Sequence, residues 1–246
     1  MAFRATNFEF RQRFFIIGAI FWGSFTLYSL DRVSAGAVLG NWLAARVALN
    51  GNHVIRAVFV FGATLSILSA TIRTWASSYL HSAVVHDRDL HSNKLVGEGP
   101  YRYVRNPLYL GTTLLSVGMG LMASRAGFAL LVIGNLVFTY RLIFREESEL
   151  IASQGESYRN YLTAVPRLWP SVSPRVPSGG GHPQWGQAFL GEGFFWIFAG
   201  ANVLFAITLS LKFWYVPMML ALSFYFLAVY LIKRRASKPE ASQTLG

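Results

Sequence analysis

The stretch that decides the fold lies near the end of the chain, where "GFFWIFAGANVLFAITLSL" (Gly193–Leu211) is followed after one lysine by "FWYVPMMLALSFYFLAVYLI" (Phe213–Ile232). Neither stretch contains a charged residue. A helix of about 20 apolar residues crosses a hydrocarbon core of about 30 Å, and it satisfies its backbone amides internally, as a membrane interior requires. These two stretches therefore predict a pair of transmembrane helices.

The composition of the whole chain agrees with this prediction. Of the 246 residues, 53% are hydrophobic and only 13% are charged, which is too apolar for an ordinary soluble domain. Four earlier runs are similar: Phe14–Leu30, Ala57–Ile72, Leu108–Ser124 and Ala126–Tyr140, the last of which is expected to extend as a span to about Phe144. We therefore expect an all-α, polytopic membrane protein with about six transmembrane helices. A signal peptide is the alternative for the first run, but Asp31 and Arg32 follow it in place of a small-residue cleavage pattern.

Lysine and arginine outnumber aspartate and glutamate by 22 to 11, which gives a net charge of +11. Such an excess could favour nucleic acid, but most basic residues lie in segments that six spans would place on one side of the membrane. The positive-inside rule then puts both termini in the cytoplasm. We expect the bacterial inner membrane, with anionic lipid rather than nucleic acid beside the basic segments. The chain has no cysteine, which excludes disulfides, thiolate catalysis and cysteine metal sites.

Connecting segments organise the chain. We expect Asp31–His53 to be a re-entrant or interfacial connector, and "SRAG" (Ser124–Gly127) to be a tight turn that makes the third and fourth spans an antiparallel hairpin. The apolar spacing after Tyr140 is typical of an amphipathic helix that leaves the membrane and that Gly155 breaks or bends. Pro170–Gly186 has the composition of a linker. The predicted divisions are N-terminal helices and connector (1–72), a catalytic module (73–170), a linker (171–187) and a C-terminal transmembrane hairpin with a basic tail (188–246).

Two polar clusters flank the predicted hairpin. The first, Leu95–Gly111, contains "GPYRYVRNPLYLG", and the second, Arg141–Arg167, contains the pair Glu146 and Glu147. An ionisable residue near membrane depth is costly and is therefore a functional candidate. Because both clusters lie at the same end of one hairpin, we expect them to be adjacent on the cytoplasmic side.

The two clusters together carry a family pattern. The sequence "LVGEGPYRYVRNPLYLG" followed by "REESELIASQGESYRNYLTAVPRLWP" resembles the membrane-embedded methyltransferases that include isoprenylcysteine carboxyl methyltransferase and the phospholipid methyltransferases. The resemblance covers about Arg73–Pro170. It implies transfer of a methyl group from S-adenosylmethionine to a lipophilic, membrane-embedded acceptor, with a carboxylate of the isoprenylcysteine type favoured.

The residue types suit the chemistry of S-adenosylmethionine. Glu146 or Glu147 can bind its amino group, and Arg105 and Asn106 can bind its carboxylate through charge-assisted hydrogen bonds. The ring of Tyr109, like that of Tyr101, can form a wall beside the sulfonium cation, which aromatic faces attract. The resemblance implies a cofactor site made of His86, Asn93, Lys94, Leu95, Val96, Gly99, Tyr101, Arg105, Asn106, Pro107, Tyr109, Glu146 and Glu147, with Arg141, Asn106 and Tyr109 in catalytic roles and Arg141 positioning the acceptor.

The chain departs from the family pattern at Asn106, where the family usually has histidine. Asparagine can donate and accept hydrogen bonds but cannot take a proton at neutral pH. A carboxylate acceptor needs no base to attack a sulfonium methyl, so we expect Asn106 to bind rather than to move a proton. An amine or phenol acceptor would need a base, for which His86, His91 or a tyrosine is the candidate.

Other interpretations of the same residues stay open at this point. The arginines and tyrosines of the first cluster could anchor a helix at the headgroups, and Glu146 and Glu147 could form a solvated face paired with Arg141 and Arg145. The chain could then be a transporter or scaffold, or an NADPH-dependent membrane reductase of the sterol type. The histidines and aspartates at residues 81–91 fit no standard metal-ligand spacing, so no metal site is expected. The C-terminal hairpin is expected to wall a lipid path or to mediate self-association.

Two groups of residues in and beside the spans are expected to have structural roles. Asn135 and Asn202 should form hydrogen bonds between helices. Trp185, Trp196 and Trp214 should be interfacial anchors.

Overall fold

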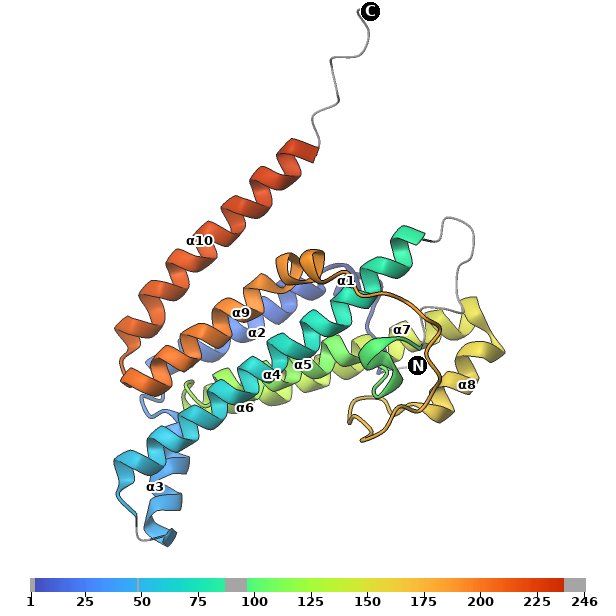
Figure 1. Ribbon diagram of the computed structural model, residues 1–246. Helices are drawn as coiled ribbons and strands as arrows, with labels where there is room; N and C mark the ends of the chain where they lie inside the picture. The colour runs from blue at the N-terminus through green and yellow to red at the C-terminus, as the bar shows by residue number, and fades with distance from the viewer. Residues whose placement is uncertain (1–2, 48, 87–96, 237–246) are drawn as a thin grey trace, which may run out of the picture.

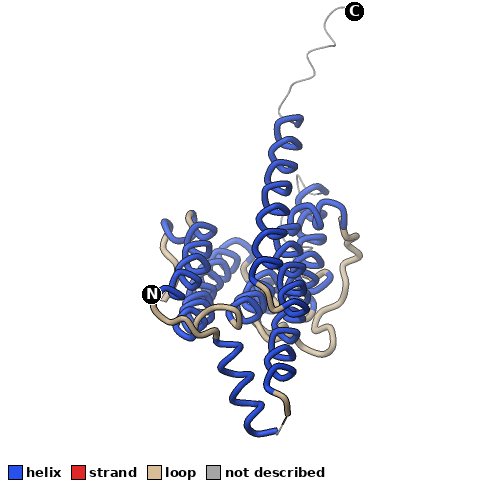
Figure 2. The backbone as a smooth tube through the Cα atoms, turned by 90° about the vertical axis from the view of Figure 1, so that its left-hand side faces the viewer, coloured by secondary structure: helices blue, strands red, loops and turns tan. Residues whose placement is uncertain are grey.

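The computed structural model describes residues 3–47, 49–86 and 97–236. Its helices, in chain order, are α1 (Asn7–Arg11), α2 (Arg13–Thr26), η1 (Leu27–Ser29), α3 (Ala35–Val47), α4 (Gly51–His86), η2 (Gly99–Arg102), α5 (Pro107–Gly120), α6 (Arg125–Ala129), η3 (Leu130–Gly134), α7 (Asn135–Gln154), α8 (Glu156–Ala164), α9 (Trp185–Thr208) and α10 (Leu211–Ala236). Figure 2 shows that helices form most of the described backbone, and these residues contain no strand. The predicted all-α membrane fold is confirmed.

The described residues include four helical stretches that are long and apolar enough to cross a membrane: Gly51–Leu80, Arg125–Gln154, Trp185–Thr208 and Leu211–Tyr230. The second runs without a break through α6, η3 and α7. The other two predicted spans coincide with shorter helices, because Arg13–Ser29 and the 14-residue α5 are the apolar segments there. Five of the six stretches nevertheless form one bundle, and the sixth, Leu211–Tyr230, joins it through its contact with α9 (Figure 1).

Helix α4 lies at the centre of this bundle and packs against α3, α5 and α9. The approach of α4 to α5 depends on glycine, since a Cβ on Gly118 would lie 2.5 Å from the Gly62 carbonyl oxygen. Small residues at such a crossing let two membrane helices pack closely. Helix α10 packs against α9 and extends away from the rest of the bundle (Figure 1).

Buried amides connect the helices as predicted. Asn202 donates to Ser66 Oγ at 2.7 Å, and Asn135 donates to Ser116 Oγ at 2.6 Å. The prediction for Trp214 is wrong: this side chain is buried and donates to Asn202 Oδ1 at 3.0 Å. The reason is that the start of α10 turns back onto α9, so that Trp214 joins the core instead of the headgroup region.

The hairpin of α5 with α6, η3 and α7 is antiparallel, as expected (Figure 1). Its turn, at residues 121–124, lies three residues earlier than the predicted turn "SRAG", because Ser124 accepts a hydrogen bond from Gly127 N and caps α6. The connector at Asp31–His53 is largely helical, and its helix α3 packs on α4.

At the opposite end of the hairpin, Gly155 breaks the helix as predicted. Its φ of +59° lies in the left-handed region that favours glycine, and it separates α7 from α8. The Pro- and Gly-rich segment that follows α8 is bonded to η2 and to the residue after it, since Arg175 N donates to Arg102 O at 2.8 Å and Ser171 N donates to Tyr103 O at 2.9 Å. This segment therefore covers the start of the hairpin before α9 begins.

Candidate active site

The segment that leads into α5 forms a compact corner. Gly99 begins η2 with φ of +52°, and a Cβ there would lie 2.4 Å from the Tyr79 ring, so only glycine fits. Asn106 then precedes α5, and Pro107 is its first residue, where a missing N–H leaves no helical hydrogen bond unmade. Pro107 therefore starts the helix that carries Tyr109.

Tyr109 and Glu146 connect the two polar clusters. Tyr109 lies in the first turn of α5, Glu146 lies in α7, and both side chains are half-buried. The Tyr109 hydroxyl donates a hydrogen bond of 2.8 Å to Glu146 Oε1. The two clusters are therefore adjacent, as the hairpin predicted.

Glu147 is only 5% exposed and lies between two arginines. Arg105 approaches its Oε1 atom at 3.0 Å, and Arg167 approaches its Oε2 atom at 2.9 Å. Arg105 also donates to the carbonyl oxygens of Leu162 and Val165. Hydrogen bonds between charged groups are stronger than neutral ones, so Arg105 ties the entry of α5 firmly to α7 and α8.

Two further residues of the motif hold the same corner. Asn106 donates from Nδ2 to the carbonyl oxygen of Arg167 at 3.0 Å, and the Tyr161 hydroxyl donates to the carbonyl oxygen of Tyr101 at 2.8 Å. Burial raises the pKa of Tyr101 above its ordinary value of 10, and burial raises the pKa of Tyr158 to about 12. Both phenols are therefore neutral at physiological pH.

The structure brings most of the described candidates together at this corner. They are Gly99, Tyr101, Arg105, Asn106, Pro107, Tyr109, Glu146 and Glu147. The predicted contacts Asn93, Lys94, Leu95 and Val96 lie outside the described residues, together with Asp87, Asp89 and His91. His86 is the last residue of α4, and its side chain also lies outside the described part.

Arg141 lies on α7 against the N-terminal segment. It forms an ion pair with Glu9, with 2.8 Å between Nη2 and Oε2, and this hydrogen bond lowers the pKa of Glu9 from its ordinary value of 4.5 to about 2. Arg145 pairs with the exposed Glu149 at 2.8 Å. The interpretation of Glu147 as part of a solvated face is wrong, because this carboxylate is buried between arginines of other segments.

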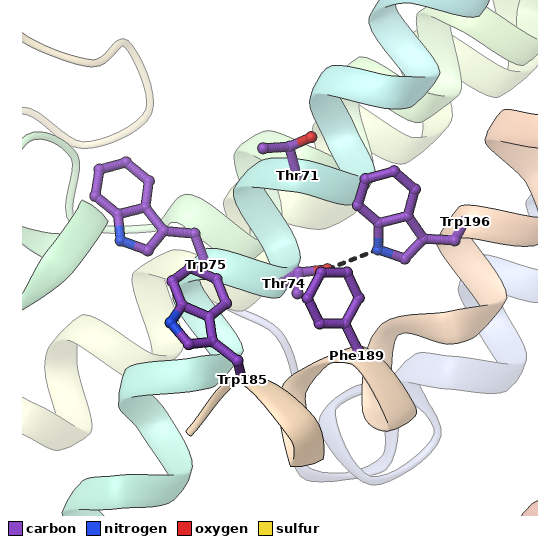
Figure 3. Close-up of a pocket in the computed structure, with 6 residues that line it drawn as sticks. All are labelled: Thr71, Thr74, Trp75, Trp185, Phe189 and Trp196. Carbon is purple, nitrogen blue, oxygen red and sulfur yellow. Dashed lines mark hydrogen bonds between the residues drawn. The ribbon is translucent and has the colours of Figure 1, made fainter. Parts of the chain in front are cut away.

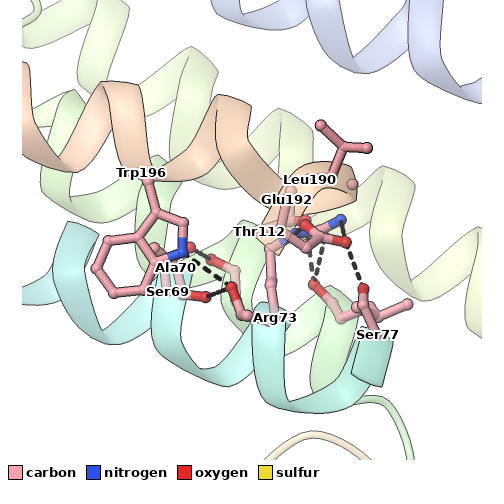
Figure 4. Close-up of polar contacts among 12 residues, drawn as sticks. Ser69, Ala70, Arg73, Ser77, Thr112, Leu190, Glu192 and Trp196 are labelled. Atoms are coloured by element: carbon pink, nitrogen blue, oxygen red, sulfur yellow. Dashed lines mark hydrogen bonds and ion pairs between the residues drawn. The ribbon is translucent and has the colours of Figure 1, made fainter. Parts of the chain in front are cut away.

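One ion pair inside the bundle was not predicted from the sequence. Arg73 of α4 and Glu192 of α9 lie 2.7 Å apart, and both are largely buried (Figure 4). Arg73 had marked only the end of a predicted span. A signal was present, since Glu192 is the only acidic residue between Glu156 and Glu240 and lies in an apolar run.

An apolar groove of about 340 Å³ lies between α4 and α9 (Figure 3). It is lined by Thr71, Thr74, Trp75, Trp185, Phe189 and Trp196. The Trp196 indole donates to Thr74 Oγ1 at 2.9 Å, and the rings of Trp75 and Tyr103 are 6.0 Å apart. Trp75 therefore connects the wall of the groove to the segment that carries the motif. Within the described ranges, no three His, Asp or Glu side chains gather as a metal site.

Comparisons with known proteins point to the same region. Residues 57–155 match the family model described as phospholipid methyltransferase. The cobalt-zinc-cadmium resistance protein CzcN of Cupriavidus metallidurans is 26% identical over 143 residues, which cover 58% of this chain and 62% of that protein. The nickel-cobalt-cadmium resistance protein NccN of Alcaligenes xylosoxydans is 26% identical over 110 residues, 44% of this chain and 48% of that protein. The methanethiol S-methyltransferase of Crocosphaera subtropica is 36% identical over 77 residues, 30% of this chain and 29% of that protein.

The chain spans less than two thirds of the length of each of these relatives, and no solved structure matches it. The fold and site together define an all-α membrane protein that contains a module similar to the phospholipid methyltransferases. The matched segment runs from within α4 to Gly155, just after α7, and contains Tyr109, Glu146 and Glu147. The resemblance predicted from the motifs is thereby confirmed.

Proposed function

We propose that this protein is a membrane methyltransferase that uses S-adenosylmethionine and acts on a lipophilic acceptor. The observation that supports this function best is the contact of Tyr109 with Glu146, beside the buried Glu147 that Arg105 holds. Residues about 40 positions apart thus come together from the two motifs that the family resemblance joins. The match of residues 57–155 to the phospholipid methyltransferase model supports the same reaction class.

The charged residues of the site suit the amino-acid end of S-adenosylmethionine, which carries an amino group and a carboxylate. Both oxygens of Glu147 are engaged by guanidinium groups, so Glu146 is the carboxylate that would accept from the amino group. Arg105 is committed to Glu147 and to two carbonyl oxygens. We therefore propose that the carboxylate of the cofactor is bound by another cation, for which Arg13 is the candidate because it begins α2, a helix that packs against α7.

When bound, S-adenosylmethionine supplies an electrophilic methyl group on a sulfonium, and the acceptor's lone pair forms the new bond as the carbon–sulfur bond breaks. The residues of this chain would bind, orient and exclude water. Tyr109 would hold Glu146 by its hydroxyl and present its ring to the sulfonium. Asn106 already donates to a backbone carbonyl, which suits a positioning role and not proton transfer. Arg141 remains our candidate for positioning the acceptor. To do so, it would release Glu9 and bind the acceptor instead.

The acceptor is proposed to reach the site along the apolar groove between α4 and α9. A carboxylate of the isoprenylcysteine type is the first candidate, because it needs no base. A thiol is the second, since one relative is named methanethiol S-methyltransferase and a thiolate is also a strong nucleophile. We propose that the site faces the cytoplasm of a bacterial inner membrane, with both termini on that side, because the predicted topology places most basic segments on the same side as the site.

Calorimetry on the detergent-purified chain tests the cofactor. We expect S-adenosylmethionine to bind and NADPH not to bind, and Glu146→Gln to weaken the affinity by roughly tenfold, the scale of one hydrogen bond to a charged group. Glu149→Gln is the matched control, because Glu149 is 53% exposed and pairs only locally with Arg145. Tight NADPH binding without S-adenosylmethionine binding would establish a reductase instead, and binding of neither would favour a scaffold or transporter.

Isotopically labelled methyl transfer then identifies the acceptor class. Purified protein in lipid nanodiscs is incubated with methyl-labelled S-adenosylmethionine and either a prenylated cysteine or an alkyl thiol. A carboxyl methyl ester releases its label as methanol in mild alkali, whereas an S-methyl thioether or an N-methyl amine keeps it. We expect alkali-labile label, and alkali-stable label would move the assignment to the thiol or amine class.

A further inference from the structure

The ion pair of Arg73 and Glu192 lies inside two helices that are long enough to cross the membrane (Figure 4). Arg73 Nε donates to Glu192 Oε2 at 2.7 Å, and the Ser77 hydroxyl donates to Glu192 Oε1. Charged groups within helices that cross a membrane are costly to bury, and a buried ion pair does not by itself stabilise a fold more than apolar residues would. The pair therefore calls for an explanation beyond packing.

The remaining bonds of Arg73 supply that explanation, because they go to α5. Its Nη1 atom donates to the Leu108 carbonyl oxygen at 2.9 Å and to Thr112 Oγ1 at 2.9 Å. These two residues flank Tyr109 in the first turns of the helix. The stem of Arg73 also packs directly on this region, since a Cβ on Gly111 would lie 2.4 Å from Arg73 Cγ.

We infer that Glu192 is a positioning residue for the candidate active site. It orients the Arg73 guanidinium, which fixes the start of α5 and thereby sets the place from which Tyr109 reaches Glu146. Glu192 lies outside the matched residues 57–155, so α9 completes a site whose other described parts come from earlier in the chain. This inference rests on the proposed function for its catalytic meaning, but its structural part can be tested without any cofactor.

The first test is amide hydrogen exchange of the full chain in detergent. Glu192→Gln keeps the shape of the side chain but removes its charge, and we expect amides in residues 110–115 to exchange roughly tenfold faster, the scale of losing one hydrogen bond to a charged group. Asp31→Asn is the matched control, because it weakens the Asp31–Arg125 pair at the other end of the hairpin. Unchanged exchange of residues 110–115 in Glu192→Gln would overturn the inference.

The second test keeps the ion pair and removes only one of the two hydrogen bonds that Arg73 donates to α5, so it also serves if Glu192→Gln fails to fold. Thr112→Val deletes the hydroxyl that Arg73 contacts, whereas Thr112→Ser retains it. We expect Thr112→Val to weaken S-adenosylmethionine binding several-fold and Thr112→Ser to restore it, with little difference in thermal stability between them. Equal affinity of the two variants would overturn the inference. A different outcome would overturn only the proposed function: the wild-type protein does not bind S-adenosylmethionine, but amides of residues 110–115 exchange faster in Glu192→Gln. In that case the structural role of Glu192 would stand.

Discussion

Glu147→Gln should destabilise the protein far more than the same change at a neighbouring glutamate. Glu147 is 5% exposed and is bonded by Arg105, whose side chain is 8% exposed, and by Arg167, whose side chain is 36% exposed. Removing one partner of a buried pair typically costs about 3–5 kcal/mol. Arg105 keeps its two carbonyl acceptors and Arg167 can be hydrated, so we expect about 2–3 kcal/mol here.

The assay is thermal unfolding of the detergent-purified chain, followed by near-ultraviolet circular dichroism. For a chain of this length, 2–3 kcal/mol corresponds to a fall of about 4–12 °C in Tm. Glu149→Gln is the control, because a solvent-exposed pair four residues apart on a helix is worth about 0.3–0.5 kcal/mol. A Tm for Glu147→Gln within 2 °C of that control would refute the argument that Glu147 holds α5, α7 and α8 together.

Three further predictions follow from individual contacts. Asn106→Ala should lower the free energy of unfolding, measured in urea, by about 1–2 kcal/mol, since the carbonyl of Arg167 loses its hydrogen-bond donor. Asn106→His should leave the turnover number unchanged in steady-state kinetics. The pKa of Glu9 is depressed to about 2, so its pair with Arg141 stabilises the fold fully above pH 4.5 and loses this effect as the pH falls through 2. Glu9→Gln should therefore lower the free energy of unfolding at pH 7 by about 0.2–1 kcal/mol, as is typical of a partly exposed pair, and thermal unfolding should show this difference shrinking as the pH falls towards 2. Asn202→Ala should reduce stability by about 0.6–1.7 kcal/mol, the range for hydrogen bonds between membrane helices, without changing cofactor affinity in calorimetry.

The hairpin made the adjacency of the two motifs predictable from the sequence. Two polar clusters at the same end of an antiparallel helix pair must meet, and Tyr109 does contact Glu146. The sequence could not say which glutamate is free to bind a ligand. That distinction depends on α8 turning back at Gly155 and on the segment beyond it placing Arg167 against Glu147, which are long-range consequences of the fold.

The hydropathy pattern also did not predict that α9 contributes Glu192 to the contacts of Arg73. The apolar run Ala57–Ile72 ends at Arg73, which looks like a boundary, yet α4 continues to His86. The helix can continue because polar side chains beyond the boundary find partners inside the bundle, as Thr74 and Ser77 do on α9. A charge pair that spans 119 positions of sequence has no local pattern to reveal it.

The central claim is that Tyr109 and Glu146 lie in the cofactor site, and cross-linking tests it most directly. Ultraviolet irradiation of the protein with labelled S-adenosylmethionine, followed by peptide mapping, locates the bound cofactor. We predict label on peptides that contain Tyr109 or Glu146, and loss of this label in the presence of excess S-adenosylhomocysteine. Label confined to α9 and α10, or label that S-adenosylhomocysteine does not displace, would contradict the account.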